Sequence, residues 1–396
     1  MGSSMSESGN IQTRAELFEF LQSQMQRVYG ELRTQQRLEY ESSQIKSYLL
    51  EVDIPDNLQK DNRSNKTLAD FVGAIMGVRQ AESAKINVKE KDEPGFFEVS
   101  YDYGGKHARV YIDANTNFRF WEVFSISKSR NLDAWLKKVI NEKSEVDFVW
   151  LWPKFLEEIQ QRGKPRGFGL DYDTRIFEGN EDEATTYLKM QIWGGPETDE
   201  LYQSLKNSNQ FKNKIVLAKI RMKEYSNGNT DSEFALQDLK YSGKCTTRGT
   251  SFSTHARTLS IIRSNYEKVI SEIEQKYAIR WVDVGKGELR IEGFAIHFIP
   301  CDFTLPVQKF CERVFEGTLP FRLMGFVEYH GDNCAVVDAV DLHSGGKVSF
   351  EVYPDIISLY LPEGTCGNSV ARFYTNLQRS FNVNFQVETD DGRALF

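Results

Sequence analysis

The sequence has 396 residues, of which 40% are hydrophobic and 27% are charged, and its formal net charge is −8. This composition provides enough apolar side chains for two or three folded domains and argues against a largely disordered chain. The negative charge argues against a protein that coats nucleic acid over its whole surface, but it allows one local basic site because charges attract through patches.

The cysteine pattern indicates the compartment. Five cysteines are present and no two of them form a CxxC pair, so we expect neither a disulfide framework nor a zinc site, and we expect a reducing, cytoplasmic location. The longest apolar run, from Phe148 to Trp152, is far shorter than the ~20 residues that cross a bilayer. We therefore predict no membrane contact, no signal peptide, no metal and no cofactor.

The first predicted element is an amphipathic helix that begins at Thr13. Thr13 and Glu16 have the spacing of a capping box, and apolar residues follow at helical intervals, namely Leu17, Leu21, Met25, Val28 and Leu32. We expect this helix to pack on its own domain. Because the spacing also suits a short coiled coil, the alternative is contact with a partner or a second copy through residues 13–40.

The remaining elements predict three segments. A helix over 68–78, a hairpin of 96–103 with 108–112 and a strand over 118–126 complete an N-terminal α+β domain, residues 13–130. Helices at 131–141, 155–161, 197–205 and 253–277 and strands at 146–152, 168–177, 186–193, 215–223, 234–241 and 279–284 form a central domain, residues 131–285. Six tryptophans are present, and we expect four of them, Trp150, Trp152, Trp193 and Trp281, in hydrophobic cores.

The C-terminal domain, residues 286–396, contains predicted strands at 288–299, 321–329, 334–342, 347–353 and 356–361, helices at 307–315 and 368–381, and an edge strand at 383–387. Runs of strands separated by single helices predict an α+β fold of mostly antiparallel sheets with helices packed on one face, in two to three domains. No GxGxxG motif follows a strand, so a dinucleotide site is not expected.

A basic segment between Leu239 and Ser253 is the most informative feature. The sequence has no acidic residue between Asp238 and Glu267, and we predict a loop that leads into a helix. Because a helix N-terminus attracts anions, this strand-to-helix loop is a candidate phosphate site. The P-loop order GxxxxGK[ST] is absent, so we expect binding without hydrolysis. The predicted binding residues are Lys240, Lys244, Thr247, Arg248, Ser251, His255 and Arg257.

A second acid-free basic segment contains Arg162, Lys164 and Arg166, followed by Phe168. Cations beside an aromatic residue are typical of grooves that bind single strands. We predict that this segment adds to the first site if the neighbouring strands share a sheet. The alternative for both basic segments is an ordinary solvated connection, with the hydroxyl residues of the first serving as helix caps.

The preferred function is therefore a non-enzymatic binding protein that recognises nucleic acid or a phosphate-bearing ligand, with no catalytic residue predicted. One alternative is a divergent metal-dependent nuclease that uses Asp171, Asp173 and Lys189, although Tyr187 stands where the second acid of a D…[DE]xK motif belongs. The other is an interaction subunit of a prokaryotic complex, for instance an antiviral defence system. The sequence does not decide whether the protein is an enzyme, and it favours a protein that is not.

Overall fold

The computed structural model describes residues 11–34, 44–55, 67–78, 85–103, 105–178, 187–211, 213–226, 233–302, 304–381 and 384–396. The chain forms two interleaved units. The first consists of Met1–Phe148, Arg162–Lys164 and Arg221–Arg263, and the second of Val149–Gln161, Pro165–Ile220 and Ser264–Phe396. The division into domains 13–130, 131–285 and 286–396 stays a prediction, because such units need not fold independently.

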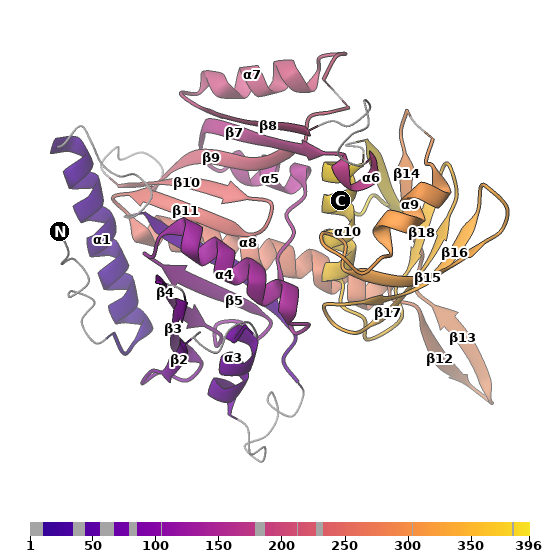
Figure 1. Ribbon diagram of the computed structural model, residues 1–396, viewed down its shortest axis with the longest axis horizontal. Helices are drawn as coiled ribbons and strands as arrows, with labels where there is room; N and C mark the ends of the chain where they lie inside the picture. The colour runs from indigo at the N-terminus through magenta and orange to yellow at the C-terminus, as the bar shows by residue number, and fades with distance from the viewer. Residues whose placement is uncertain are drawn as a thin grey trace. The chain divides into compact units, whose positions relative to one another are not determined.

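The first unit is built on an antiparallel sheet with the strand order β2-β3-β4-β5-β1-β11-β10, in which β6 also pairs with β1 (Figure 1). The last residues of β9 (Leu217–Tyr225) continue this sheet beside β10. The predicted hairpin of 96–103 with 108–112 is confirmed by β3 and β4. The bounds are β1 (Ile45–Val52), β2 (Lys85–Glu90), β3 (Phe96–Tyr103), β4 (Lys106–Asp113), β5 (Phe120–Ser125), β6 (Val146–Phe148), β10 (Phe234–Lys240) and β11 (Lys244–Gly249).

The centre of this sheet is β1, where no strand is predicted from the sequence. All eight of its residues are buried, and they include the polar residues Lys46, Ser47 and Glu51. A strand that is covered on both faces lacks the polar and apolar alternation that marks a half-exposed strand. The sequence therefore did not predict this strand, because its pairing with neighbouring strands and its burial on both faces, and not an alternating pattern, determine its conformation.

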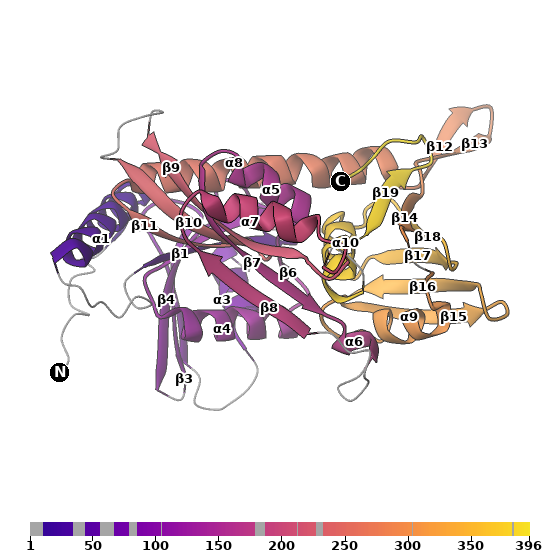
Figure 2. The same cartoon turned by 90° about the horizontal axis from the view of Figure 1, so that it is seen from above.

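Helices lie on both sides of β1. Tyr48 and Leu50 belong to the hydrophobic core that also contains α3 (Leu68–Met76) and Trp135 of α4 (Ser129–Glu142). Ser47 points the other way and contacts His255 of α8 (Phe252–Glu272). Figure 2 shows α4 and α8 on opposite sides of these strands. This arrangement gives the first unit two buried layers, one beneath each helix.

The N-terminal helix α1 (Arg14–Thr34) packs on its own unit. The capping box is confirmed, because Glu16 N–H donates to Thr13 Oγ1 over 3.1 Å and Thr13 N–H donates to Glu16 Oε2 over 3.2 Å. The described apolar stripe is buried, namely Leu17, Leu21, Met25 and Val28. Partner contact through residues 13–40 stays a prediction, and residues 35–40 lie outside the described part of the chain.

The predicted basic loop is a strand. After β10 the chain turns at Gly243, whose φ is 67°, and returns as β11 with Leu239 opposite Cys245 and Ala235 opposite Gly249. β11 also pairs with β1. The loop prediction was wrong because short polar residues between two glycines indicate a connection, whereas pairing with two neighbours makes this segment an interior strand. The start of the long helix near residue 253 is confirmed by α8.

The second unit contains the predicted hairpin of β7 (Lys164–Asp173) and β8 (Tyr187–Trp193), confirmed by the register that sets Asp171 opposite Lys189. A six-stranded sheet has the order β15-β16-β17-β18-β14-β19, and β12 with β13 forms a separate hairpin. Here the bounds are β12 (Arg280–Gly285), β13 (Glu288–Glu292), β14 (Ile296–Pro300), β15 (Leu323–Tyr329), β16 (Ala335–Asp341), β17 (Lys347–Val352), β18 (Ile357–Tyr360) and β19 (Phe385–Thr389).

One face of the six-stranded sheet packs on α9 (Val307–Val314) and α10 (Asn368–Ser380). The ring of Phe373 in α10 lies 5.0 Å from that of Phe298 and 5.3 Å from that of Phe350. The other described helices of this unit are α5 (Pro153–Gln160), α6 (Arg175–Glu178), α7 (Glu197–Lys206) and the π-helical end of α8, Ile273–Tyr277. The predicted strands at 321–329, 334–342, 347–353 and 356–361 and the edge position of the final strand are confirmed. The single strand predicted over 288–299 is wrong, because β13 and β14 occupy it and belong to different sheets.

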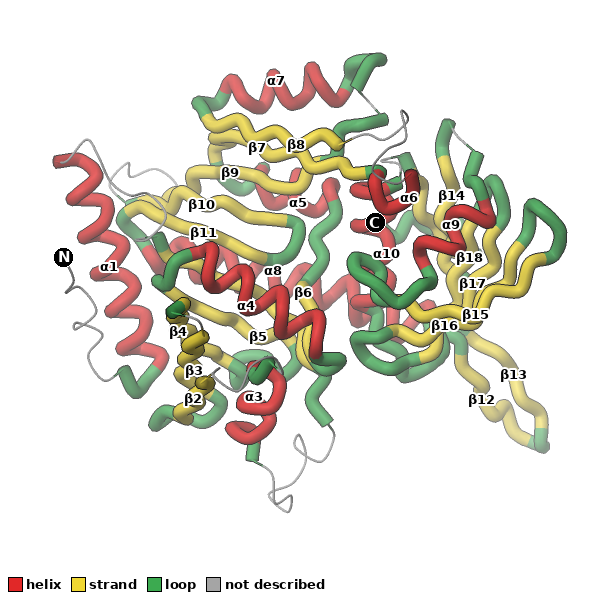
Figure 3. Tube along the Cα trace, viewed as in Figure 1, coloured by secondary structure: helices red, strands yellow, loops and turns green. Residues whose placement is uncertain are grey.

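Helices and mostly antiparallel strands occur in both units (Figure 3). The predicted α+β fold class of mostly antiparallel sheets is therefore confirmed. The expectation of helices on one face does not hold in the first unit, where α4 and α8 lie on opposite sides of β1. None of the helices in the described ranges is long and apolar enough to cross a membrane.

Candidate functional site

The N-terminus of α8, where the sequence predicts a phosphate site, binds side chains of the protein itself. Phe252 N–H donates to Gln22 Oε1 over 2.7 Å, and Gln22 Nε2 donates to the carbonyl of Thr250 over 2.7 Å. Thr254 N–H donates to Ser251 Oγ over 3.3 Å. An anion would have to displace Gln22 and Ser251 from these N–H groups. The first turn of α8 is therefore a helix start that is capped by side chains of the protein, as in the alternative interpretation of this segment.

His255 is fully buried and cannot contact an external ligand in this structure. Its Nδ1 lies 2.8 Å from Gln237 Oε1 and its Nε2 lies 2.8 Å from Ser47 Oγ. Because an amide oxygen only accepts, Nδ1 carries the hydrogen and Nε2 accepts from the Ser47 hydroxyl. Burial lowers the pKa of His255 to about 3, so the imidazole is neutral at ordinary pH.

The order Ser47, His255, Gln237 has the geometry of a nucleophile, a base and an orienting group. All three side chains are completely buried, and catalysis by this set would require a substrate at Ser47 Oγ. Gln237 Nε2 instead donates to Thr258 Oγ1 over 2.8 Å. The chain of hydrogen bonds ties β1 and β10 to α8, and its role here is structural.

Lys244 is held beneath α4. Its ammonium lies 2.7 and 2.6 Å from the two carboxylate oxygens of Asp133, which also accepts from the Tyr48 hydroxyl over 2.6 Å. Burial and the charge of Asp133 raise the pKa of Tyr48 well above its ordinary value, with burial the larger cause. Lys244 is therefore an internal ion-pair partner in this structure.

The predicted residues divide between the two faces of the sheet. Successive residues of a strand point to opposite sides, so Lys244 and Arg248 lie on the α4 side of β11 while Thr247 lies on the α8 side. Arg257 is on α8, where it forms a 3.2 Å ion pair with Glu224. The structure thus does not gather the predicted set into one site.

A different set gathers on the α4 side of the sheet, where β10 and the end of β9 are seen uncovered in Figure 1. We call this surface the basic face and define it by Lys164, Arg221, Lys223, Tyr225, Lys240 and Arg248. On β9, Arg221, Lys223 and Tyr225 are partly exposed, whereas the intervening Met222 and Glu224 are buried. The register between β10 and β11 sets Arg248 opposite Leu236 and places Lys240 on the same side.

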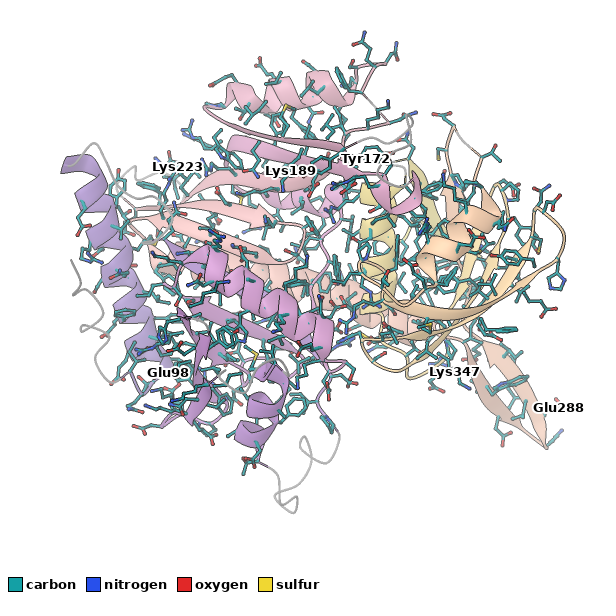
Figure 4. The ribbon with its side chains drawn as sticks, viewed as in Figure 1. Glu98, Tyr172, Lys189, Lys223, Glu288 and Lys347 are labelled. Carbon is teal, nitrogen blue, oxygen red and sulfur yellow. The ribbon has the colours of Figure 1, made fainter. Side chains whose placement is uncertain are left out.

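Aromatic rings position two of these cations. Lys164 Nζ lies 5.1 Å and Lys223 Nζ lies 4.7 Å from the ring centroid of Tyr225. Lys223 Nζ also lies 4.0 Å from the ring of Phe234, and Figure 4 labels this lysine on β9. Gly163 permits the approach, because a Cβ there would lie 2.9 Å from the carbonyl oxygen of Lys223.

Among the described residues of β9, β10 and β11, Asp238 is an acid that lies on the same side of the sheet as the basic face. Asp238 receives two hydrogen bonds from Arg221, of 2.5 and 2.7 Å, so its charge is balanced inside the face. In the described part of the chain, Lys164 and Lys223 have aromatic rings as their partners, so they add positive charge to the basic face in a protein whose net charge is −8. Clustered cations of this kind create a local positive potential that attracts anions despite the overall sign.

Only part of the second predicted basic segment lies on the basic face. Lys164 lies on the basic face, and Arg162 is an exposed residue of the same unit. Arg166 belongs to the second unit, where its carbonyl accepts from Gly194 N–H over 3.0 Å. Sequence reasoning missed Arg221, Lys223 and Tyr225, although the alternating pattern KIRMKEY carried the signal of a half-exposed basic strand.

The carboxylates of the nuclease alternative are bound to arginines. Asp171 accepts from Arg379 over 2.9 Å, and Asp173 accepts from Arg175 Nε over 2.7 Å. Hydrogen bonds from Arg175 lower the pKa of Asp173. Lys189 lies opposite Asp171 as expected from the hairpin. A carboxylate that already pairs with an arginine is a poor ligand for a cation, since the arginine would have to be displaced.

Comparisons with known proteins place the chain among relatives. The family of MJECL33-like proteins matches residues 5–395. A protein of Methanocaldococcus jannaschii, described as the uncharacterized protein MJECL33, is 25% identical over 426 residues, which cover 96% of this chain and 95% of the relative. The similarity therefore extends over nearly the whole length of both chains, and neither description states a ligand or a reaction.

Proposed function

This chain belongs to the family of MJECL33-like proteins, and we propose that it binds nucleic acid or another phosphate-bearing polyanion through the basic face of its first unit. The observation that carries the proposal is the pair of ammonium groups of Lys164 and Lys223, 5.1 and 4.7 Å from the ring of Tyr225. We place this activity in the cytoplasm, because none of the five cysteines forms a disulfide.

The aromatic contacts support binding of an anion. Two ammonium groups near one ring repel each other, and the negative face of the ring reduces that cost without neutralising either charge. A carboxylate in the same place would cancel the positive potential. Lys164 and Lys223 are thus held in position while they keep the charge that a phosphate would neutralise.

The spacing of the cations favours an extended ligand over a single phosphate. Lys164 and Lys223 flank Tyr225 at the end of β9, and Lys240 lies on the same side of the neighbouring strand β10. Lysine ammonium groups act as point charges on a phosphate backbone and do not distinguish bases. We therefore propose binding that depends little on base sequence and strongly on salt.

The test replaces Lys164 and Lys223 by glutamate in one protein, and fluorescence anisotropy then measures its affinity for a short labelled single-stranded oligonucleotide. We expect at least about a tenfold loss of affinity, equivalent to about 1.4 kcal/mol. Removing two phosphate contacts also lowers the slope of log K against log salt by about 1.4, since each contact to a single strand contributes about 0.7.

The matched control is Lys268→Glu with Lys309→Glu, which changes the net charge equally at two exposed positions of the second unit. We expect this protein to bind as the wild type does. Equal loss in both double variants would mean that only net charge matters, and unchanged binding by Lys164→Glu with Lys223→Glu would refute the proposal. Circular dichroism confirms that each variant is folded.

The metal-dependent nuclease stays the alternative function, and no specific contact favours it. Both of its carboxylates pair with arginines, at 2.9 Å for Asp171 and 2.7 Å for Asp173. Incubation of an oligonucleotide with Mg²⁺ or Mn²⁺, compared between the wild type and Asp171→Ala, decides between the two functions. Metal-dependent cleavage that is lost in Asp171→Ala would replace the binding proposal with an enzymatic one.

A further inference from the structure

The hairpin β12–β13 carries an apolar surface that is exposed in the described part of its unit. We call Arg280–Glu292 the arm, and Figure 1 shows it extending away from the six-stranded sheet, with Glu288 labelled near its tip in Figure 4. The register sets Trp281 opposite Ile291 and Asp283 opposite Leu289, so the three apolar side chains share one face. Trp281 is 66% exposed, and the expectation that it lies in a core was wrong.

An arm of this kind needs a partner surface. Two strands with no third strand or helix against them are marginally stable in water, and burial of Trp281 and Leu289 would stabilise them by about 1.5–3 kcal/mol for each large side chain. The arm has three cations and three acids, Arg280, Lys286 and Arg290 against Asp283, Glu288 and Glu292, and so is neutral. Neutrality argues against a polyanion as the partner and favours a protein surface.

The same unit carries a second uncovered apolar surface, the outer face of β15 and β16. Met324 and Phe326 project from β15 beside Val340 of β16, on the side away from the buried Leu323. Phe326 is 76% exposed. Neighbouring exposed apolar side chains are a feature of contact surfaces on folded proteins. The chain thus presents two apolar surfaces, the arm and the outer face.

We propose that the protein forms a two-fold dimer in which the arm of each copy lies on the outer face of the other. The size of the arm argues for a second copy over an unrelated protein. Its strands have six and five residues, about half of the 20–30 residues per side of a stable interface. In a two-fold dimer the contact occurs twice, because each copy contributes both its arm and its outer face. An unrelated partner on either surface would leave the other uncovered.

The experiment measures the molar mass of the full chain by light scattering after size exclusion at micromolar concentration. We expect twice the chain mass of 45.6 kDa for the wild type. Trp281→Asp and Phe326→Asp should each run at the mass of one chain, because each substitution disrupts both symmetry-related contacts. Leu201→Asp on α7 is the matched control at an exposed apolar residue outside both surfaces, and it should keep the mass of two chains.

Mixing the two variants separates this dimer from other assemblies. The arm of Phe326→Asp and the outer face of Trp281→Asp are both intact, so an equimolar mixture keeps one of the two contacts and should form a two-chain species only at a concentration well above that at which the wild type dimerises. A one-chain mass for the wild type overturns the proposal, as does a two-chain mass for either variant alone. A mixture that dimerises as tightly as the wild type, or no more tightly than either variant alone, also overturns it. Matched thermal unfolding of the variants excludes misfolding as the cause.

Discussion

At the scale of single residues, burial decides which predicted groups are available for chemistry. His255 follows a basic segment and looks like a phosphate ligand in the sequence, yet it lies between Ser47 and Gln237 in the core. Lys244 looks like a free cation, yet it pairs with Asp133. Lys223 was not among the binding residues predicted from the sequence, yet it lies on the basic face. Residue type alone did not separate these cases because each depends on what packs against the side chain.

His255 should make the stability of the protein depend on pH. Its folded pKa is about 3, below the ordinary 6.5, because burial penalises the charged form. Between these values the unfolded chain binds a proton that the folded chain does not. The free energy of unfolding should therefore fall as the pH drops below about 6.5, by up to about 1.36 kcal/mol per pH unit from this group.

The measurement compares urea unfolding of the wild type and His255→Gln between pH 7.5 and pH 5, where the glutamine variant lacks this titration. Glu122, whose pKa burial raises to about 7, titrates in both proteins and cancels in the difference. We expect the wild type to lose part of its advantage over the variant on acidification. A difference in stability that stays constant with pH would contradict a buried neutral imidazole.

At the scale of elements, local patterns predicted those that face water on one side. The strands of the last third show period-two alternation, and the structure confirms them. β1 is buried on both faces and β11 is short and polar, so neither has that alternation. The capping box of α1 was visible because it is a local signal, whereas the contact of Gln22 with α8 joins residues 230 positions apart.

Gln22 should contribute to stability as a cap supplied by a distant helix. Its amide accepts from Phe252 N–H and donates to the carbonyl of Thr250, both over 2.7 Å. Gln22→Ala should lower the free energy of unfolding by about 1–2 kcal/mol, because it leaves helix-start groups without a partner. Gln26→Ala on the exposed side of α1 is the control and should change the stability by less than about 0.5 kcal/mol. Equal effects of the two substitutions in urea unfolding would show that the cap is unimportant.

At the scale of the whole molecule, the two proposals concern different units of the chain. The basic face lies in the first unit, and the arm and outer face lie in the second. The net charge of −8 gave no indication of the basic face, because acidic and basic residues are distributed unequally over the surface of the protein. The two activities should therefore be separable by mutation.

This separation is itself testable with the variants already described. Lys164→Glu with Lys223→Glu should keep the mass of two chains while losing oligonucleotide affinity. Trp281→Asp should have the mass of one chain while keeping wild-type affinity for an oligonucleotide short enough to occupy one basic face. Loss of both properties in either protein would indicate that assembly and binding share one surface.

The sequence by itself determined the α+β class, the capped start of α1, the strand-rich last third and the long helix that begins near residue 253, because each depends on local periodicity or capping. Only the tertiary structure decided the central position of β1, the strand state of β11 and the location of the basic face. Pairing between strands distant in the chain sets which side chains share a face, and a shift of one residue would exchange Arg248 for Thr247. The predicted basic segment contributed Lys240 and Arg248 to that face, long-range packing enclosed Lys244, Thr247, Ser251 and His255, and Arg257 is exposed on α8.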